Sequence, residues 1–203
     1  MEILEALKEL RKDDKRKFMQ TLDLIVNLQK IDIRTQALNS FVEVPHPSER
    51  KVCAILSKKS KIIDTITEDE FNKYKEAKDM KKLAKKYDFF IASAPLMSKV
   101  ASKFGRVLGP VGKMPSPQAG IVTKEDEDVV KAEVEKMQRM VRVRTKEKSV
   151  KLPLGREDMS DEELKENVES VVNSLINLLP IGKENIKDIL IKFTMTKPVK
   201  VEL

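Results

Sequence analysis

The segment VPHPSER, residues 44–50, divides the chain and thereby decides its fold. Pro45 and Pro47 each fix their own φ angle, restrict the preceding residue and lack a backbone N–H donor. Before this segment, TLDLIVNL at 21–28 alternates with a period of two, which predicts a half-buried strand, and a second strand is expected at 41–44. The segment is therefore predicted to be a linker that leaves a first sheet.

The residues after the linker alternate between strand and helix patterns. Short apolar strands are expected at 51–56 and 87–93, and helices at 68–86 and 94–104. Such alternation predicts a small parallel α/β unit.

The remaining patterns lie near the two ends of the chain. Ser160 and Glu163 have the spacing of a capping box, which predicts a long helix that Pro180 ends. The other expected elements are helices at 3–10 and 126–140, a hairpin of strands 141–145 and 149–152, and a last strand at 186–195.

A second punctuated stretch, FGRVLGPVGKMPSPQAG at 104–120, holds four of the six glycines and three of the nine prolines. A phosphate loop is disfavoured, because Met114 follows Gly112-Lys113 where a Ser or Thr would bind magnesium, and Val107 replaces the upstream glycine. A surface turn and a hinge remain. The hinge interpretation assigns the movement to Gly109 and Gly112, with Pro45 and Pro47 stiffening the other connection.

The two punctuated stretches bracket the α/β unit, so the simplest architecture is a discontinuous domain with an insertion. The predicted split domain comprises 1–46 and 118–203, and the inserted domain comprises 47–117. Residues 47–123 hold 16 Lys and Arg against 8 Asp and Glu, whereas the rest holds 24 against 25. The excess positive charge is therefore expected in the insertion.

Composition narrows the class of protein. The net charge of +7 fits either a polyanionic partner or a soluble basic surface. The single Cys53 excludes a disulfide framework, favours a reducing cytosolic setting and is expected to be a buried, inert thiol. No apolar run has the ~18–20 residues of a membrane span, and the first residues lack the apolar region typical of a signal peptide, so a cytoplasmic protein without membrane partners is expected.

The sequence shows no pattern that favours a catalytic site. The only histidine, His46, lies between two prolines, and one Cys with one His cannot build a zinc site of Cys/His type. The carboxylates fall in charged helices, where a solvated face is the simplest explanation. We therefore expect no catalytic residues, no metal and no cofactor; a nucleotide-utilising α/β enzyme is a remote alternative.

Four phrases occur in the order seen in one family: RKFMQTLDLIVNL at 16–28, KKLAKKYDFFIASAPLM at 81–97, LGPVGKMPSP at 108–117 and FTMTKP at 193–198. Together they resemble the ribosomal protein L-one family, the large-subunit stalk protein, in its archaeal and eukaryotic form. The resemblance implies an α/β (α+β) fold: a discontinuous two-layer α/β domain from both termini with an inserted Rossmann-like three-layer α/β domain.

The resemblance also implies a function and partners. It implies a constituent of the large ribosomal subunit that binds large-subunit rRNA at the mobile stalk and assists release of tRNA from the exit site. A translational repressor that binds its own mRNA leader is the alternative. The chain is expected to be monomeric when free of the ribosome.

The resemblance places RNA contacts on Lys17, Phe18, Thr21, Thr194 and Met195. Lysine can bind phosphate, phenylalanine can stack, and a threonine hydroxyl can bond the 2′-OH that marks RNA. Further phosphate contacts are expected from Arg16, Arg142, Arg144 and Lys197.

Three positions depart from the family pattern. Thr196 replaces a glycine next to the RNA, Val111 replaces an arginine, and the stretch 56–66 is short enough for a helix of the insertion to be missing.

Overall fold

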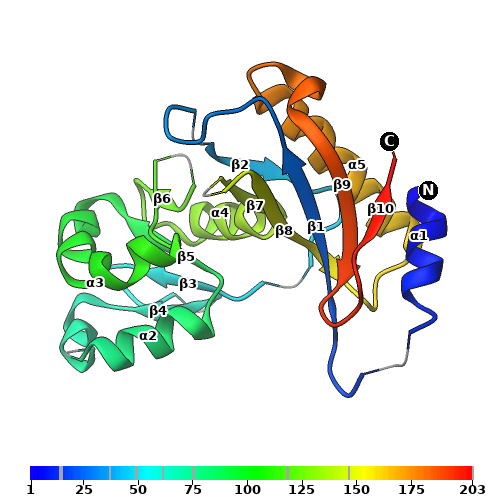
Figure 1. Ribbon diagram of the computed structural model, residues 1–203. Helices are drawn as coiled ribbons and strands as arrows, with labels where there is room; N and C mark the ends of the chain where they lie inside the picture. The colour runs from blue at the N-terminus through cyan, green and yellow to red at the C-terminus, as the bar shows by residue number, and fades with distance from the viewer. Residues whose placement is uncertain are drawn as a thin grey trace. The chain divides into compact units, whose positions relative to one another are not determined.

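The computed structural model describes residues 1–13, 16–36, 38–48, 50–60, 62–74, 76–117, 119–145 and 147–202. The chain forms two compact units (Figure 1): unit 1 is Met1–Ser48 with Arg139–Leu203, and unit 2 is Glu49–Gln138. The second boundary therefore differs from the expected one at 117/118, where Gln118 itself lies outside the described residues. The residues after 118 pair and pack with the insertion, as shown below.

Unit 1 is built on a four-stranded sheet of order β10-β9-β1-β8 in which every pairing is antiparallel. The alternation in β1 (Thr21–Leu28) is confirmed: Leu22, Leu24 and Val26 are fully buried, while the positions between them are half-buried. The other strands are β8 (Ser149–Arg156), β9 (Ile186–Phe193) and β10 (Val199–Val201). No strand was expected at β10.

Two helices supply the other layer of unit 1. α1 (Ile3–Leu10) and α5 (Asp161–Leu178) bury Leu7 and Val168 in the same core as the apolar face of β1. The predicted capping box is present: the Glu163 N–H donates to Ser160 Oγ, and the Ser160 N–H donates to the Glu163 carboxylate. The helix η3 (Gly182–Asn185) follows α5.

A separate two-stranded sheet corrects the expected hairpin. β7 (Met140–Arg144) pairs with β2 (Asn39–Glu43) and not with β8. At the end of this pair the Val44 N–H donates to the Arg139 carbonyl at 2.7 Å. The two chain segments that lead to unit 2 are thus hydrogen-bonded to each other inside unit 1.

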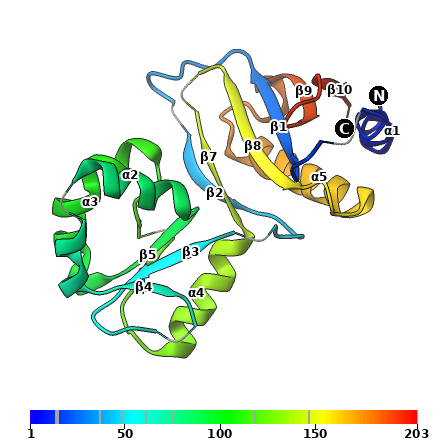
Figure 2. The same cartoon turned by 90° about the horizontal axis from the view of Figure 1, so that it is seen from below.

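Unit 2 has a parallel sheet of order β4-β3-β5-β6, from β3 (Val52–Ile55), β4 (Asp64–Ile66), β5 (Phe89–Ser93) and β6 (Ile121–Val122). α2 (Ala77–Lys86) and α3 (Met97–Val111) lie on one face, and α4 (Glu127–Arg139) lies on the other (Figure 2). This three-layer arrangement confirms the expected fold class. β6 and α4 explain why residues after 118 belong to unit 2.

Two local expectations in unit 2 need correction. The helix expected over 68–86 is interrupted: η1 (Glu68–Lys73) places Phe71 against Phe104, and α2 begins only at Ala77. A further short helix, η2 (Ala94–Leu96), precedes α3. Between β3 and β4 the described residues form no helix, in keeping with the short 56–66 stretch.

The stretch 104–120 is mostly the end of a helix. α3 continues through Gly109 and Pro110 to Val111, and Gly112 ends it with a left-handed φ of 80°. The Lys113 N–H bonds the Leu108 carbonyl, and the Gly112 N–H bonds that of Gly109, which is a Schellman-type helix end. Both glycines lie within unit 2, so the hinge assigned to them does not coincide with a connection between the units.

The corrected boundary changes how the positive charge is divided between the two units. Unit 2 holds 19 Lys and Arg against 14 Asp and Glu, and unit 1 holds 21 against 19. The excess in unit 2 is smaller than expected because acidic α4 belongs to it. Within the described ranges, no helix is both long and apolar enough to cross a membrane.

Candidate nucleic-acid interface

Two segments from opposite ends of the chain meet where β1 begins and β9 ends. Thr194 follows β9, and its hydroxyl accepts the Thr21 N–H at 3.0 Å and lies 3.4 Å from the Thr21 carbonyl, to which it can donate. The predicted proximity of these two threonines is thus present. The hydroxyl joins protein backbone, however, so Thr194 positions the two segments.

Gln20 strengthens the same junction. Its side chain is buried, and its Oε1 accepts the Met195 N–H at 3.1 Å. Its backbone forms a reciprocal pair with Glu157: the Glu157 N–H donates to the Gln20 carbonyl at 2.9 Å, and the Gln20 N–H donates to Glu157 Oε2 at 3.3 Å. Nothing in the sequence pattern indicated Gln20 or Glu157.

Arg11 is a second residue that sequence reasoning missed. Its guanidinium donates to the carbonyls of Glu157 and Met159 at 2.8 and 2.7 Å and forms an ion pair with Asp161 at 2.7 Å. It also lies over the Phe193 ring, 5.8 Å from the centroid. Arg11 therefore fixes the turn between β8 and α5 against the last residue of β9.

The junction presents apolar side chains to solvent. Phe18 is 50% exposed, Met19 48% and Met195 59%, although each is a residue type that normally lies in a core. Lys17 and Lys197 are exposed on the same two segments. We call this set, Lys17, Phe18, Met19, Thr194, Met195 and Lys197, the terminal surface.

Thr196 does not join this surface, contrary to expectation. Its side chain is only 7% exposed, and its hydroxyl accepts the Phe193 N–H at 2.9 Å while lying 3.3 Å from the Phe193 carbonyl. The Thr196 N–H also bonds that carbonyl. Thr196 therefore closes the turn from within, and it is not available to contact RNA.

Arg142 and Arg144 lie on a different sheet. Both occupy the outward-facing positions of β7, where Arg142 donates to Asn39 Oδ1 at 2.9 and 3.1 Å and covers the Phe41 ring. Burial, together with the nearby Arg144, lowers the pKa of Arg142. Soon after Arg144 the chain reaches Ser149, which pairs with Asn27, about 20 Å along β1 from Thr21. These arginines are therefore separate from the terminal surface, whereas Arg16 is exposed next to it.

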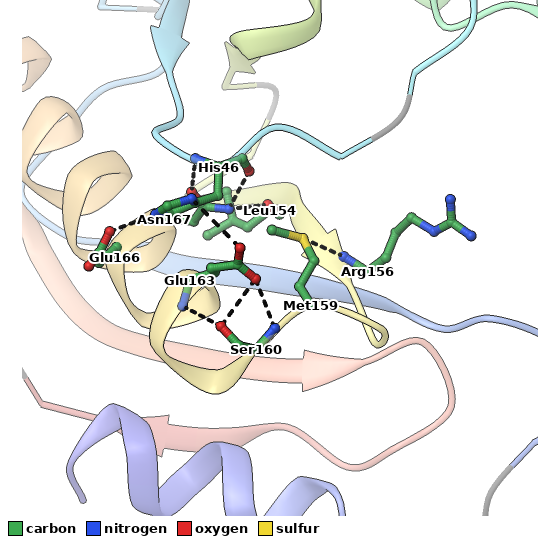
Figure 3. Close-up of polar contacts among 8 residues, drawn as sticks. All are labelled: His46, Leu154, Arg156, Met159, Ser160, Glu163, Glu166 and Asn167. Carbon is green, nitrogen blue, oxygen red and sulfur yellow. Dashed lines mark hydrogen bonds and ion pairs between the residues drawn. The ribbon is translucent and has the colours of Figure 1, made fainter.

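The first connection to unit 2 is anchored to α5 (Figure 3). Asn167 is fully buried; its Oδ1 accepts the His46 N–H at 2.9 Å, and its Nδ2 donates to the carbonyls of His46 and Leu154 at 2.7 and 3.0 Å. The His46 ring lies 2.6 Å from Glu166 Oε2. The stretch from Pro45 to Pro47 is thus held from one side by a helix.

Lys113 has a structural role, which argues against the phosphate-loop interpretation. Its ammonium donates to the carbonyls of Ala84 and Tyr87 at 3.0 and 2.8 Å, at the C-terminal end of α2. A cation is favourable there because the helix end carries partial negative charge and unpaired carbonyls. Across the described ranges, no group of three or more His, Cys, Asp or Glu side chains could hold a metal ion.

The fold and this interface define a two-unit α/β protein with an exposed, basic and apolar surface of the kind that nucleic acids contact. Residues 7–197 match the model of the Ribosomal protein L1p/L10e family, and the chain belongs to that family. It is 39% identical to the large ribosomal subunit protein uL1 of Thermococcus kodakarensis over 98% of this chain and 96% of the relative.

Other relatives agree. The uL1 proteins of Pyrococcus horikoshii and Nanoarchaeum equitans are 37% and 35% identical over 98% of this chain, covering 95% and 98% of their own lengths. The suspected family is thereby confirmed. The chain is a structural protein of the large ribosomal subunit, active in translation and not an enzyme.

Proposed function

We propose that the chain binds large-subunit rRNA through the terminal surface of unit 1. The observation that carries this proposal is the Thr194–Thr21 junction, which fixes two segments far apart in sequence so that Phe18 and Met195 stay exposed beside lysines. Exposed aromatic and thioether side chains can pack on unstacked bases, and the lysines can neutralise phosphates.

The hydrogen bonds at the junction make the proposal more specific. Gln20, Thr194 and Thr196 hydrogen-bond backbone groups of Met195, Thr21 and Phe193 and so hold the ends of β1 and β9 together before RNA arrives. A preorganised surface loses less conformational entropy on binding than a flexible one. Thr194 contributes to recognition by holding this geometry, and Met195 and Phe18 supply the contact.

The experiment compares two apolar truncations in unit 1. Phe18→Ala is expected to lower affinity for a large-subunit rRNA fragment about ten-fold, because a base–aromatic stack is lost. Ile181→Ala removes an equally exposed side chain outside the terminal surface and should leave affinity unchanged. Filter binding measures both variants, and thermal unfolding checks that they fold. Equal losses for the two variants would contradict the proposal.

Finer roles concern unit 2 and the free chain. We propose that unit 2, through exposed lysines of α2 such as Lys81 and Lys85, contacts tRNA leaving the exit site. Any rotation of unit 2 would be absorbed where the units join, just after Pro47 and at the direct passage from α4 into β7, instead of at Gly109 and Gly112. We further propose that the chain is a monomer when free of the ribosome.

A repressor role would use the same residues. If the chain's own mRNA leader contains a similar RNA element, the terminal surface would bind it as well. Competition between the leader and the rRNA fragment, measured with wild type and Phe18→Ala, tests this alternative: binding of the leader that Phe18→Ala does not weaken would contradict it.

A further inference from the structure

The parallel sheet of unit 2 has a topological switch point. From β3 the chain proceeds to β4 on one side, and then returns to place β5 on the other side of β3. In open parallel sheets the crevice beyond the carboxyl ends of two such strands is the usual place for a ligand. The segments that follow β3 and β5 lie at this edge of the sheet.

In this chain the crevice holds a carboxylate of the protein itself. The Ser57 N–H, just beyond β3, lies 3.1 Å from each oxygen of Glu125, and the Ser57 hydroxyl donates to Glu125 Oε1 at 2.9 Å. The Lys58 N–H and the Ser93 hydroxyl at the end of β5 also act on this carboxylate. Glu125 itself lies between β6 and α4.

The donors form a set that suits an oxyanion. Burial alone would raise the pKa of Glu125, but the nearby polar groups of Ser93, Ser57 and Lys58 outweigh it and hold the pKa below its ordinary value. The Ser57 hydroxyl and N–H thus bind this negative group directly, and the Ser93 hydroxyl and the Lys58 N–H lie close enough to favour its charge. Successive N–H groups at the end of a strand are a common way of binding phosphate.

One member of the set is incompletely satisfied. Ser93 is 1% exposed, and its Oγ makes no hydrogen bond of ordinary geometry with any described residue, although it faces the Glu125 carboxylate. A buried hydroxyl without a good partner is unfavourable. A planar carboxylate offers two oxygens to these donors, whereas a tetrahedral phosphate offers more acceptor oxygens to the same groups.

We propose that the C-terminal edge of this sheet is an oxyanion site for a phosphate group, and that the chain keeps the site closed with its own Glu125. This inference is independent of RNA binding by unit 1. Free phosphate competes poorly in wild type because the tethered carboxylate has a high effective concentration and repels a second anion. Removing the carboxylate leaves the donors in place and opens the site.

The test is a titration of inorganic phosphate into the full chain, followed by the backbone amide signals of Ser57 and Lys58. Glu125→Ala should bind phosphate at least about ten-fold more tightly than wild type, since each charge-assisted hydrogen bond is strong. Glu127→Ala is the matched control, because it removes the same charge from an exposed position two residues away. Sodium chloride of equal ionic strength corrects for screening.

Two results would overturn the proposal. One is phosphate binding by Glu125→Ala no tighter than by Glu127→Ala; the other is equal binding by wild type at Ser57 and Lys58. Should Glu125→Ala fail to fold, an acid titration of wild type decides. The Ser57 and Lys58 amide signals must then move together with a midpoint below the ordinary pKa of glutamate, and a midpoint at or above it would refute the assigned contact.

Discussion

The two units carry their positive charge differently. Unit 2 has the larger excess, but seven of its lysines, among them Lys73, Lys86 and Lys113, lie within 4.0 Å of a carboxylate of the same unit. Unit 1 is closer to neutral and also pairs cations with carboxylates, among them Arg11, Lys30 and Lys200, yet Arg16, Lys17 and Lys197 make no ion pair with any described residue. Net charge therefore indicates a basic protein without indicating which surface binds a polyanion.

The largest expected effect is on rRNA affinity, and it is tested by replacing unpaired lysines in each of the two units. The double substitution Lys17→Ala with Lys197→Ala should weaken rRNA binding about a hundred-fold, because two charge-assisted phosphate contacts are lost. The log–log dependence of affinity on salt should become shallower by about two units. Lys81→Ala with Lys85→Ala removes the same charge from unit 2 and should change neither quantity. A larger loss from the unit 2 pair would place rRNA binding there instead.

The next effect distinguishes the roles of two threonines in one turn, Thr194 and Thr196. Thr194→Val leaves the Thr21 N–H without its partner at the terminal surface, so rRNA affinity should fall about ten-fold. Thr196→Val orphans the buried Phe193 N–H and should lower the free energy of unfolding by about 1–3 kcal/mol. Urea unfolding and filter binding measure the two quantities. Identical profiles for both variants would show that the two hydroxyls share one role.

A smaller effect concerns a lysine that supports structure. Lys113→Met removes a cation from the C-terminal end of α2 and should destabilise unit 2 by about 1 kcal/mol without affecting rRNA affinity. Lys81→Met, at an exposed position of α2, is the control and should be nearly neutral. Hydrogen exchange of the α2 amides measures the difference, and equal protection in both variants would argue against capping by Lys113.

The smallest effect is a pH dependence in unit 2. Hydrogen bonds from Lys73 and Lys59 lower the pKa of Glu70 from 4.5 to about 2. Because the folded value is the lower one, the stabilisation is complete above pH 4.5 and is lost as the pH falls toward 2. Glu70→Gln should therefore flatten the loss of stability across this window. High salt should diminish the difference, since the lysines are exposed.

Short sequence patterns correctly predicted those parts of the fold that depend on a few neighbouring residues. The period of two in β1 and the capping box of Ser160 and Glu163 are confirmed because each is decided within a few residues. The hairpin at 141–152 is wrong because strand pairing depends on a distant partner, here β2. Gly109 and Pro110 resemble a turn, but α3 includes both and ends only at Val111.

At the terminal surface, too, some features could be predicted from the sequence and others could not. The family pattern indicated Phe18 and Met195, and both are exposed. It did not indicate that Thr196 points inward, a contact that lies within its own turn. It could not indicate that Gln20 and Arg11 brace the surface, since those contacts join segments more than a hundred residues apart. For Glu125, no local pattern links the residue to Ser57, because the sheet alone brings them together.

The antiparallel pairing of Glu43 with Met140, continued by the Val44–Arg139 bond, has a consequence for how the chain folds. Unit 2 stands where a tight turn would join two neighbouring strands. Left unfolded, such a long loop would oppose this pairing entropically, though only logarithmically with length. Once folded, unit 2 brings its own ends together, so β2 and β7 meet as if they were neighbours in sequence. We therefore expect an unfolded insert to slow formation of unit 1, as measured by refolding kinetics of a variant destabilised only in unit 2.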